Sequence, residues 1–207
     1  MSEKIKLAVD CDDTIISYSQ EYLAYLGMKV GRNYNIADFK TTQWPLHAGL
    51  TKDVFDSHVR DFFHTDDYLK LPPIPGARDS LLKLKELYEL HVVTARPDFV
   101  IEHTQNSINL FFPNVFSDIH YTNTVTPKPG AIVRSKSDIC KHIGAFTIIE
   151  DNPGEALNFV NNGYIHRKAY LLLSTPWAVE ASLKKLHDRV YPMRTWENVE
   201  VALLSER

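Results

Sequence analysis

Cysteine and long hydrophobic runs are the scarcest features of this sequence. Its two cysteines, Cys11 and Cys140, fall at an expected strand end and in an expected helix, and they form no C-x-x-C pair. We therefore expect reduced, mostly buried thiols rather than a disulfide framework or a cysteine metal site. No segment approaches the roughly 18 consecutive apolar residues of a membrane helix, and the start MSEKIKLAVD lacks a signal-peptide run. These absences predict a cytoplasmic protein without a membrane partner.

An excess of basic charge is also missing. The chain has 23 Lys and Arg against 26 Asp and Glu, for a net charge of -3, which argues against a nucleic-acid polymer as partner. The nine histidines show no H-x-x-x-H or H-E-x-x-H spacing, so a histidine zinc site has little support. No G-x-x-x-x-G-K-[ST] loop is present, which disfavours a nucleoside-triphosphate enzyme.

What is present is an alternation of short apolar runs and helical patterns. The runs predict strands at residues 4–10, 90–94, 118–122, 145–150 and 168–173. Between them, Leu81, Leu84 and Leu87 share one helical face, and the stretch that begins at Ile101 repeats the pattern. This order predicts an α/β fold, a Rossmann-like parallel sheet with helices on both faces, in which ligands bind beyond the carboxyl ends of the strands.

Residues 15–74 break the alternation. They are rich in aromatic side chains and contain short helical patterns at residues 19–27 and 52–63. We interpret this stretch as a small helical cap inserted after the first strand, and the Pro-rich LPPIPGA as the return to the sheet. The predicted division is therefore a core domain of residues 1–14 and 75–207 with a cap of residues 15–74.

Acidic residues gather where predicted strands end. Asp10, Asp12 and Asp13 follow the first strand, and Glu150 and Asp151 follow the run FTII. Clustered carboxylates cost stability unless a cation or hydrogen-bond donors offset them. Caps for the following helices are the simpler explanation, but two acids directly after an apolar strand make capping alone the weaker account. Magnesium, which prefers carboxylate and carbonyl oxygens, is the cation expected there.

Four motifs in chain order resemble one family. They are D-x-D-x-T at Asp10, Asp12 and Thr14, a strand-terminal threonine in HVVTARP, a lysine in RSKSDICKHIG and the acidic pair in IIEDNP. Together they resemble the haloacid dehalogenase superfamily of aspartate-nucleophile phosphohydrolases. The resemblance spans the whole core and implies magnesium-dependent hydrolysis of a small phosphate monoester through an aspartyl-phosphate.

The resemblance also implies roles for residues near the first strand. Asp10 matches the nucleophile, whose second carboxylate oxygen contacts the metal. Asp12 matches the general acid and base, with its backbone carbonyl on the metal. Thr94 matches the hydroxyl that holds a phosphate oxygen, although a threonine can simply end a strand. Asp13 stands where many relatives have glycine, and we assign it no chemistry.

The remaining roles fall in the second half of the chain. Lys136 matches the lysine that neutralises nucleophile and phosphate. Lys128 in TPKPG is a rival for it, and we prefer Lys136 because it lies one helix upstream of the strand that bears Glu150. Asp151 matches a direct metal ligand, and Glu150 a ligand that acts directly or through water.

The substrate class rests on a less specific resemblance. The cap position, IPGA, VVTARP, LLLSTPW and RTWENV look like the 5′(3′)-deoxyribonucleotidase branch, which implies nucleoside monophosphates as substrates. On this interpretation Ala95 and Arg96 lie at the phosphate, and a cap aromatic, Trp44, Phe62 or Phe63, stacks on a base. Arg96 could instead pair with a surface acid, and the aromatics could form the core of the cap.

Two other functions remain open from the sequence. One is a phosphatase for a small non-nucleotide phosphate, such as a sugar phosphate or phosphoglycolate. The other is a catalytically silent binding protein that kept the fold, although the intact acidic motifs argue against it. The oligomeric state is not determined by the sequence, and a homodimer is one option.

Overall fold

A six-stranded, all-parallel sheet forms the centre of the computed structural model, which describes residues 4–162 and 165–206. The strand order is β3-β2-β1-β4-β5-β6. The strands are β1 (Ile5–Val9), β2 (Tyr88–Thr94), β3 (Asp118–Tyr121), β4 (Thr147–Glu150), β5 (Lys168–Leu172) and β6 (Val190–Met193). This arrangement confirms the predicted α/β class and five of its predicted strands.

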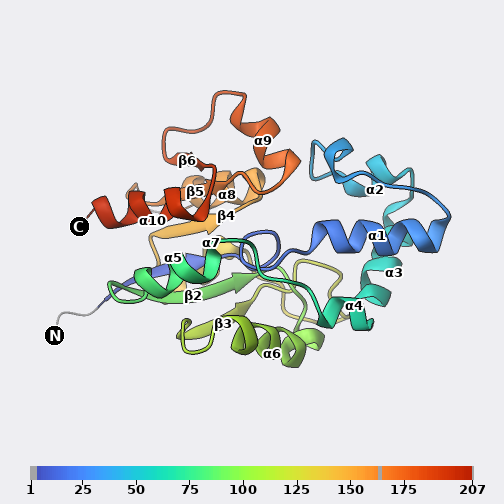
Figure 1. The fold of residues 1–207 in the computed structure, drawn as a ribbon, viewed down its shortest axis with the longest axis horizontal. Helices are drawn as coiled ribbons and strands as arrows, with labels where there is room; N and C mark the ends of the chain where they lie inside the picture. The colour runs from blue at the N-terminus through green and yellow to red at the C-terminus, as the bar shows by residue number, and fades with distance from the viewer. Residues whose placement is uncertain (1–3, 163–164, 207) are drawn as a thin grey trace.

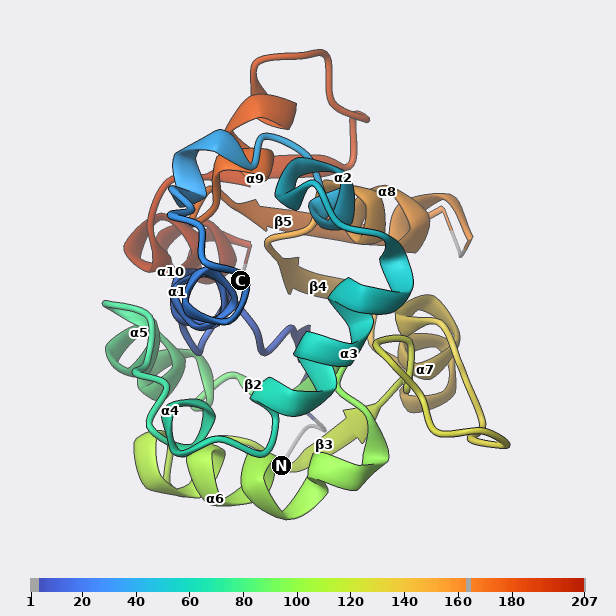
Figure 2. The same ribbon diagram turned by 90° about the vertical axis from the view of Figure 1, so that its right-hand side faces the viewer.

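Helices cover both faces of the sheet. Figure 2 shows α5 and α10 on one side of the strands and α7 and α8 on the other. The core helices are α5 (Ala77–Leu84), α6 (Ile101–Phe111), α7 (Lys136–Ile143), α8 (Pro153–Asn161), α9 (Pro176–Ser182) and α10 (Trp196–Ser205), with a 3-10 turn η2 at Asp98–Val100. Because both faces are covered, strand residues such as Leu7, Ala8 and Val9 are fully buried. Their continuous apolar character follows from this double burial.

The sixth strand was not predicted from the sequence. β6 pairs with β5 at the edge of the sheet, where Pro192 lies opposite Leu171. Proline cannot donate a ladder hydrogen bond, so within sheets it is tolerated at an edge. The strand is only four residues long and contains this proline. For both reasons its sequence shows no apolar periodicity that would predict a strand.

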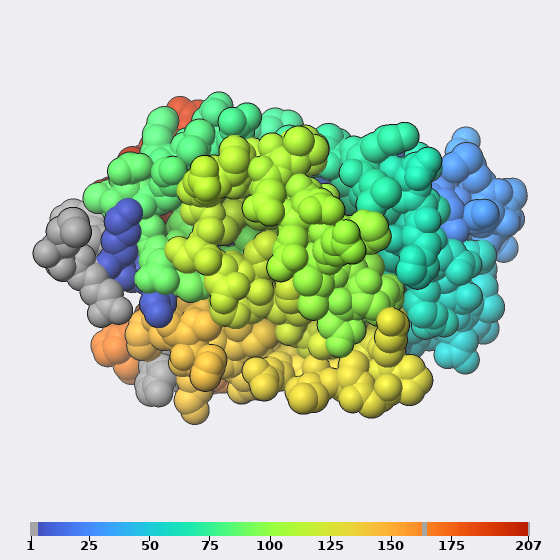
Figure 3. Space-filling model, turned by 90° about the horizontal axis from the view of Figure 1, so that it is seen from below, coloured from blue at the N-terminus to red at the C-terminus, as the bar shows by residue number. Residues whose placement is uncertain are grey.

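Between β1 and β2 the chain forms a separate group of short helices. They are α1 (Ser19–Val30), the 3-10 turn η1 (Ile36–Asp38), α2 (Trp44–Ala48), α3 (Lys52–Phe62) and α4 (Asp66–Leu69). Figure 1 places this helical segment beyond the carboxyl ends of the strands, and Figure 3 shows it at one end of the molecule. That residues 15–74 form a domain separate from the core stays a prediction.

The helical segment is held together by aromatic packing. Phe62 of α3 is fully buried and lies 5.1 to 5.8 Å, between ring centroids, from Tyr18, Tyr22, Tyr25 and Tyr68. These mostly tilted and edge-on contacts are the arrangements that aromatic pairs prefer. The prediction that short helices with an aromatic core occupy this stretch agrees with the structure.

Register brings the ends of the central strands to one level. Val9 of β1 lies opposite Val92 of β2 and Ile149 of β4, so the next residue, Asp10, stands beside the ends of both neighbours. The Asp10 amide donates to the Ile149 carbonyl at 2.9 Å, which continues the β1–β4 ladder by one residue. Asp10, Thr94 and Glu150 are therefore placed side by side by the sheet itself.

Two further predictions can be compared with the fold. Cys11 and Cys140 are both buried and free. None of the helices in the described part of the chain has the length and apolar character needed to cross a membrane.

A hydrogen bond from the last helix secures the loop after β1. Trp196, at the start of α10, is 1% exposed and donates from Nε1 to the Thr14 carbonyl at 2.8 Å. Trp196→Phe removes this donor and leaves a buried carbonyl without it, so we expect a loss of about 1–3 kcal/mol in the free energy of unfolding. Urea denaturation followed by far-UV circular dichroism measures it. An unchanged midpoint would show that the bond contributes nothing to stability.

Candidate active site

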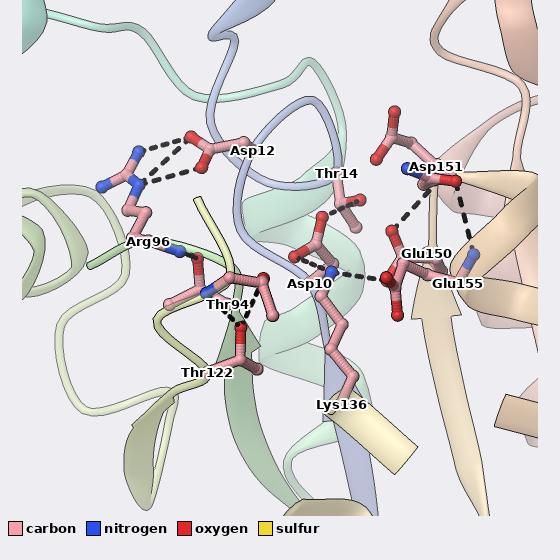
Figure 4. Close-up of polar contacts among 12 residues, drawn as sticks. Asp10, Asp12, Thr14, Thr94, Arg96, Thr122, Lys136, Glu150, Asp151 and Glu155 are labelled. Atoms are coloured by element: carbon pink, nitrogen blue, oxygen red, sulfur yellow. Dashed lines mark hydrogen bonds and ion pairs between the residues drawn. The ribbon is translucent and has the colours of Figure 1, made fainter. Parts of the chain in front are cut away.

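A buried ion-pair network lies at the carboxyl end of β1. Lys136, the first residue of α7, donates from Nζ to Asp10 Oδ1 at 2.6 Å and to Glu150 Oε2 at 2.7 Å. All three residues are at most 4% exposed. Figure 4 shows Lys136 directed from its helix toward Asp10 at the strand ends. Lys128, the rival from the sequence, lies instead over the Phe99 ring at 5.1 Å.

Three carboxylates form a compact acidic cluster. Asp10, Glu150 and Asp151 each offer an oxygen, and these oxygens lie within 4.8 Å of one another. Trp177 of α9 donates from Nε1 to Asp151 Oδ2 at 2.9 Å, and the Asn152 amide donates to Glu150 Oε1 at 3.1 Å. These donors orient the carboxylates without neutralising them.

Burial makes the charged form of this cluster costly. Desolvation raises the pKa of Glu150 to about 8, with the nearby Asp10 charge adding to the effect. Burial likewise raises the pKa of Asp10 and of Asp151 above their ordinary values, and Lys136 offsets part of the shift. Three carboxylates face one ammonium, so a bound cation or protons must compensate the remaining charge. A hard divalent cation such as Mg²⁺ fits this donor set.

Asp12 does not join the cluster with its side chain. Both of its carboxylate oxygens accept from Arg96: Oδ1 from Nη2 at 2.7 Å and from Nε at 3.2 Å, and Oδ2 from Nε at 3.0 Å. Figure 4 shows Asp12 pointing away from Asp10 toward this guanidinium. Arg96 therefore pairs with an acid of the site rather than with a surface acid. The backbone-carbonyl role predicted for Asp12 at a metal stays a prediction.

The threonines of the motifs lie deeper than the carboxylates. Thr94 is fully buried at the end of β2, where its Oγ1 accepts from the Arg96 amide at 3.2 Å. Thr14 is also fully buried, and its hydroxyl lies 3.4 Å from Asp10 Oδ2. Ala95 and Arg96 line the cavity described below. Binding of phosphate by Thr94, Ala95 and Arg96 stays a prediction.

Asp13 carries a structural role in the loop after β1. Its φ of 56° lies in the left-handed region. Few residues other than glycine adopt this conformation, although asparagine and aspartate do so more readily than most. Its buried carboxylate accepts from the Tyr18 and Ser19 amides at 3.0 Å and from the Ser19 hydroxyl. Burial raises the pKa of Asp13 to about 6 although these donors oppose the shift. Asp13 therefore fastens the first turn of α1 to the loop after β1.

A cavity of about 400 Å³ opens above the network, between the strand ends and the helical segment. Asp10, Asp12, Lys136 and Asp151 lie at its polar end. Six aromatic side chains, here called the aromatic wall, also line it: Tyr18, Tyr22, Trp44, Phe55, Phe63 and Trp177.

Two of the three aromatics predicted as candidates for base stacking, Trp44 and Phe63, line this cavity. The Trp44 ring centroid lies 5.1 Å from that of Trp177. Phe62 does not line the cavity, because it is fully buried in the aromatic core of the helical segment. The structure therefore does not support substrate contact by Phe62.

Several lining residues were missed from the sequence. Trp177 lies in LLLSTPW, a stretch noted only for its resemblance, and Glu155 lies one helical turn beyond Asp151. Spacing on α8 could have indicated Glu155. No local pattern could have indicated that Tyr18 or Trp177 faces the acidic cluster, because their positions depend on packing between distant segments.

Comparison with known proteins adds evidence on the fold. No protein-family model and no curated protein matches the sequence. Solved structures do match over nearly the whole chain. A haloacid dehalogenase-like hydrolase from Streptococcus pneumoniae is 14% identical, with a TM-score of 0.70 over 97% of this chain and 98% of its own.

Two further similar structures carry more specific names. A protein assigned as a phosphoglycolate phosphatase from Lactobacillus delbrueckii subsp. bulgaricus is 18% identical, with a TM-score of 0.69 over 97% of this chain and 99% of its own. D,D-heptose 1,7-bisphosphate phosphatase from B. bronchiseptica, solved with magnesium and phosphate, is 12% identical, with a TM-score of 0.57 over 98% of this chain and 100% of its own. The chain therefore has the haloacid dehalogenase fold that its motifs predict, while the deoxyribonucleotidase branch stays a prediction.

The acidic cluster predicts stabilisation by magnesium. A ligand that binds the folded state alone raises the melting temperature as its concentration rises. We expect Mg²⁺ to raise the melting temperature of the wild-type protein relative to EDTA, and Asp151→Asn to lose most of this difference. Asp188→Asn, at an exposed position, serves as the matched control. Equal responses of Asp151→Asn and wild type in differential scanning fluorimetry would rule out the cluster as the binding site.

Proposed function

We propose that this protein is a magnesium-dependent phosphomonoester hydrolase that acts through phosphorylation of Asp10. The observation that carries the proposal is the placement of Asp10 at the polar end of a cavity, within 2.6 Å of Lys136 and within the acidic cluster. A phosphate monoester is an anion, so a carboxylate can approach it only where positive charge is concentrated. Lys136 and a cation held by Asp10, Glu150 and Asp151 provide that charge.

Asp10 supplies the nucleophile. One carboxylate oxygen attacks phosphorus, the bond from phosphorus to the leaving oxygen breaks, and an aspartyl-phosphate forms. Lys136 remains beside Asp10 and offsets charge on the carboxylate and on the incoming phosphate. When bound, Mg²⁺ supplies charge neutralisation and orients the phosphate oxygens. To the Thr94 hydroxyl, at the end of β2, we assign the binding of one of those oxygens.

Asp12 supplies the proton transfers. Its side chain lines the same cavity and is 24% exposed, so it can reach a leaving oxygen or a water molecule. As an acid it gives a proton to the leaving oxygen, and as a base it takes a proton from the water that attacks the phosphoenzyme. A binding protein without chemistry would have no need to keep both aspartates in these positions.

The aromatic wall favours a substrate with a planar, apolar portion. Trp44, Phe55, Phe63 and Trp177 line the cavity together with the acidic cluster, and base stacking on such rings contributes to nucleotide binding. We therefore propose nucleoside monophosphates as the preferred substrates. A non-nucleotide substrate such as phosphoglycolate is the second candidate, since a structure of similar fold is assigned as a phosphoglycolate phosphatase. The small, charged phosphoglycolate would leave the aromatic wall unused.

Replacement of the two aspartates separates their roles. Asp10→Asn keeps the side-chain shape but cannot form the acyl phosphate, so both chemical steps are expected to disappear. Asp12→Asn keeps the nucleophile and removes proton transfer, typically worth about 10²–10⁴-fold. With 4-nitrophenyl phosphate, whose leaving group needs little acid assistance, Asp12→Asn should form the phosphoenzyme and then stall.

Rapid-quench kinetics measure this difference. We expect one enzyme equivalent of nitrophenol in a burst for Asp12→Asn and none for Asp10→Asn. The circular dichroism spectrum of each variant controls for folding. Near-native turnover by a folded Asp10→Asn would refute the covalent mechanism.

A substrate panel distinguishes the two candidate substrate classes. We expect nucleoside monophosphates to exceed phosphoglycolate and sugar phosphates by at least tenfold in kcat/KM, about 1.4 kcal/mol in transition-state binding. Trp44→Leu should raise KM for the nucleotide and leave KM for a sugar phosphate nearly unchanged, because only the former uses the ring. A tenfold preference for phosphoglycolate in the wild-type protein would select the second candidate.

A further inference from the structure

Arg96 is held in place from several sides. Its guanidinium donates from Nε and Nη2 to Asp12 and from Nη1 to the Thr104 hydroxyl of α6 at 3.2 Å. The Tyr68 ring of α4 lies 5.1 Å from the guanidinium carbon. The side chain is only 2% exposed. From the loop after β2, Arg96 therefore contacts both α6 and the helical segment. At the same place it binds the Asp12 carboxylate.

The geometry of this pair defines the orientation of Asp12. Both Asp12 oxygens accept N–H groups of Arg96. The planar fork of an arginine fixes the orientation of its partner, which a lysine ammonium does not do. Asp12 is thus held in one orientation, with a partly exposed edge toward the cavity.

Asp12 acts as a base in one half of the proposed reaction. During phosphoenzyme hydrolysis, a water oxygen forms a bond to phosphorus while the bond from phosphorus to the Asp10 oxygen breaks. The water proton passes to Asp12, and Asp10 leaves as a carboxylate. In the first half, a leaving group such as 4-nitrophenolate departs with little acid assistance. With such a substrate, hydrolysis of the phosphoenzyme is therefore the step that depends on the position of Asp12.

We infer that Arg96 is a positioning residue that holds Asp12 as the general base for hydrolysis of the phosphoenzyme. This inference rests on the proposed function and goes beyond it by assigning Arg96 to one chemical step. It also assigns Arg96 a role different from phosphate binding: the side chain is 2% exposed, and its Nε, Nη1 and Nη2 groups each donate to Asp12 or Thr104.

The kinetic signature of this role is a split between kcat and kcat/KM. For a covalent mechanism, kcat/KM reports the steps up to formation of the phosphoenzyme, whereas kcat includes its hydrolysis. With 4-nitrophenyl phosphate and Mg²⁺, we expect Arg96→Gln to lower kcat at least tenfold and KM in parallel, so that kcat/KM stays within about threefold of wild type. Rapid quench should show a nitrophenol burst and accumulated phosphoenzyme.

Matched variants give the test its controls. Arg78→Gln makes the same change at an exposed position of α5 and should leave both constants unchanged. Arg96→Lys should recover only part of the hydrolysis rate, since an ammonium lacks the fork. Addition of Arg96→Gln to Asp12→Asn should slow dephosphorylation no further, because Arg96 acts through Asp12. If Arg96→Gln fails to fold, Thr104→Val, which removes a partner of Arg96, should give the same signature at smaller size.

The outcomes that overturn the inference are distinct. A large fall in kcat/KM with a rise in KM would identify Arg96 as a phosphate-binding residue. Equal losses with no burst, or a further slowing in the double variant, would exclude action through Asp12. Unchanged kinetics in Arg96→Gln would also overturn it. Absence of phosphatase activity in the wild-type protein would instead refute the proposed function, and this inference with it.

Discussion

The charge balance around Asp10 is the constraint on which the rest of the structure depends. Three buried carboxylates share a space less than 5 Å across with the single ammonium of Lys136. Such a group is stable only if every element that brings it together is held firmly, since desolvation opposes it. The β1–β4 register fixes Asp10 beside Glu150, and Lys136 extends toward both from the first turn of α7. The fold therefore assembles an unfavourable arrangement of charge that a divalent cation would relieve.

The helical segment completes the site with a different kind of interaction. Its aromatic side chains pack mainly on one another, and some of the same rings, such as Trp44 beside Tyr22 and Phe39, also line the cavity. Among its contacts with the polar end, Asp13 binds the first turn of α1, and Tyr68 of α4 lies on Arg96. The polar end of the sheet and the aromatic rings of the insertion thus meet at one cavity.

The sequence predicted those parts of the molecule that depend on local pattern. Apolar runs located five strands, and motif order located Asp10, Lys136, Glu150 and Asp151, which the structure brings together. Contacts between distant segments were not predictable. Arg96 and Asp12 are 84 residues apart, and nothing near either one specifies the fork between them. Trp44 and Phe62 carry the same aromatic signal in the sequence, and only three-dimensional packing determines which of them faces the cavity.

The order of these contacts along the chain has a consequence for biosynthesis. The lysine that neutralises Asp10 follows it by 126 residues, and the Trp196 contact that fixes Thr14 spans 182 residues. At about 5–20 residues per second, the nascent Asp10 carboxylate waits many seconds for Lys136. The central strand β1 likewise cannot gain its β4 neighbour until β4 has emerged. The acidic end of the sheet therefore becomes structured only after translation of α10 begins.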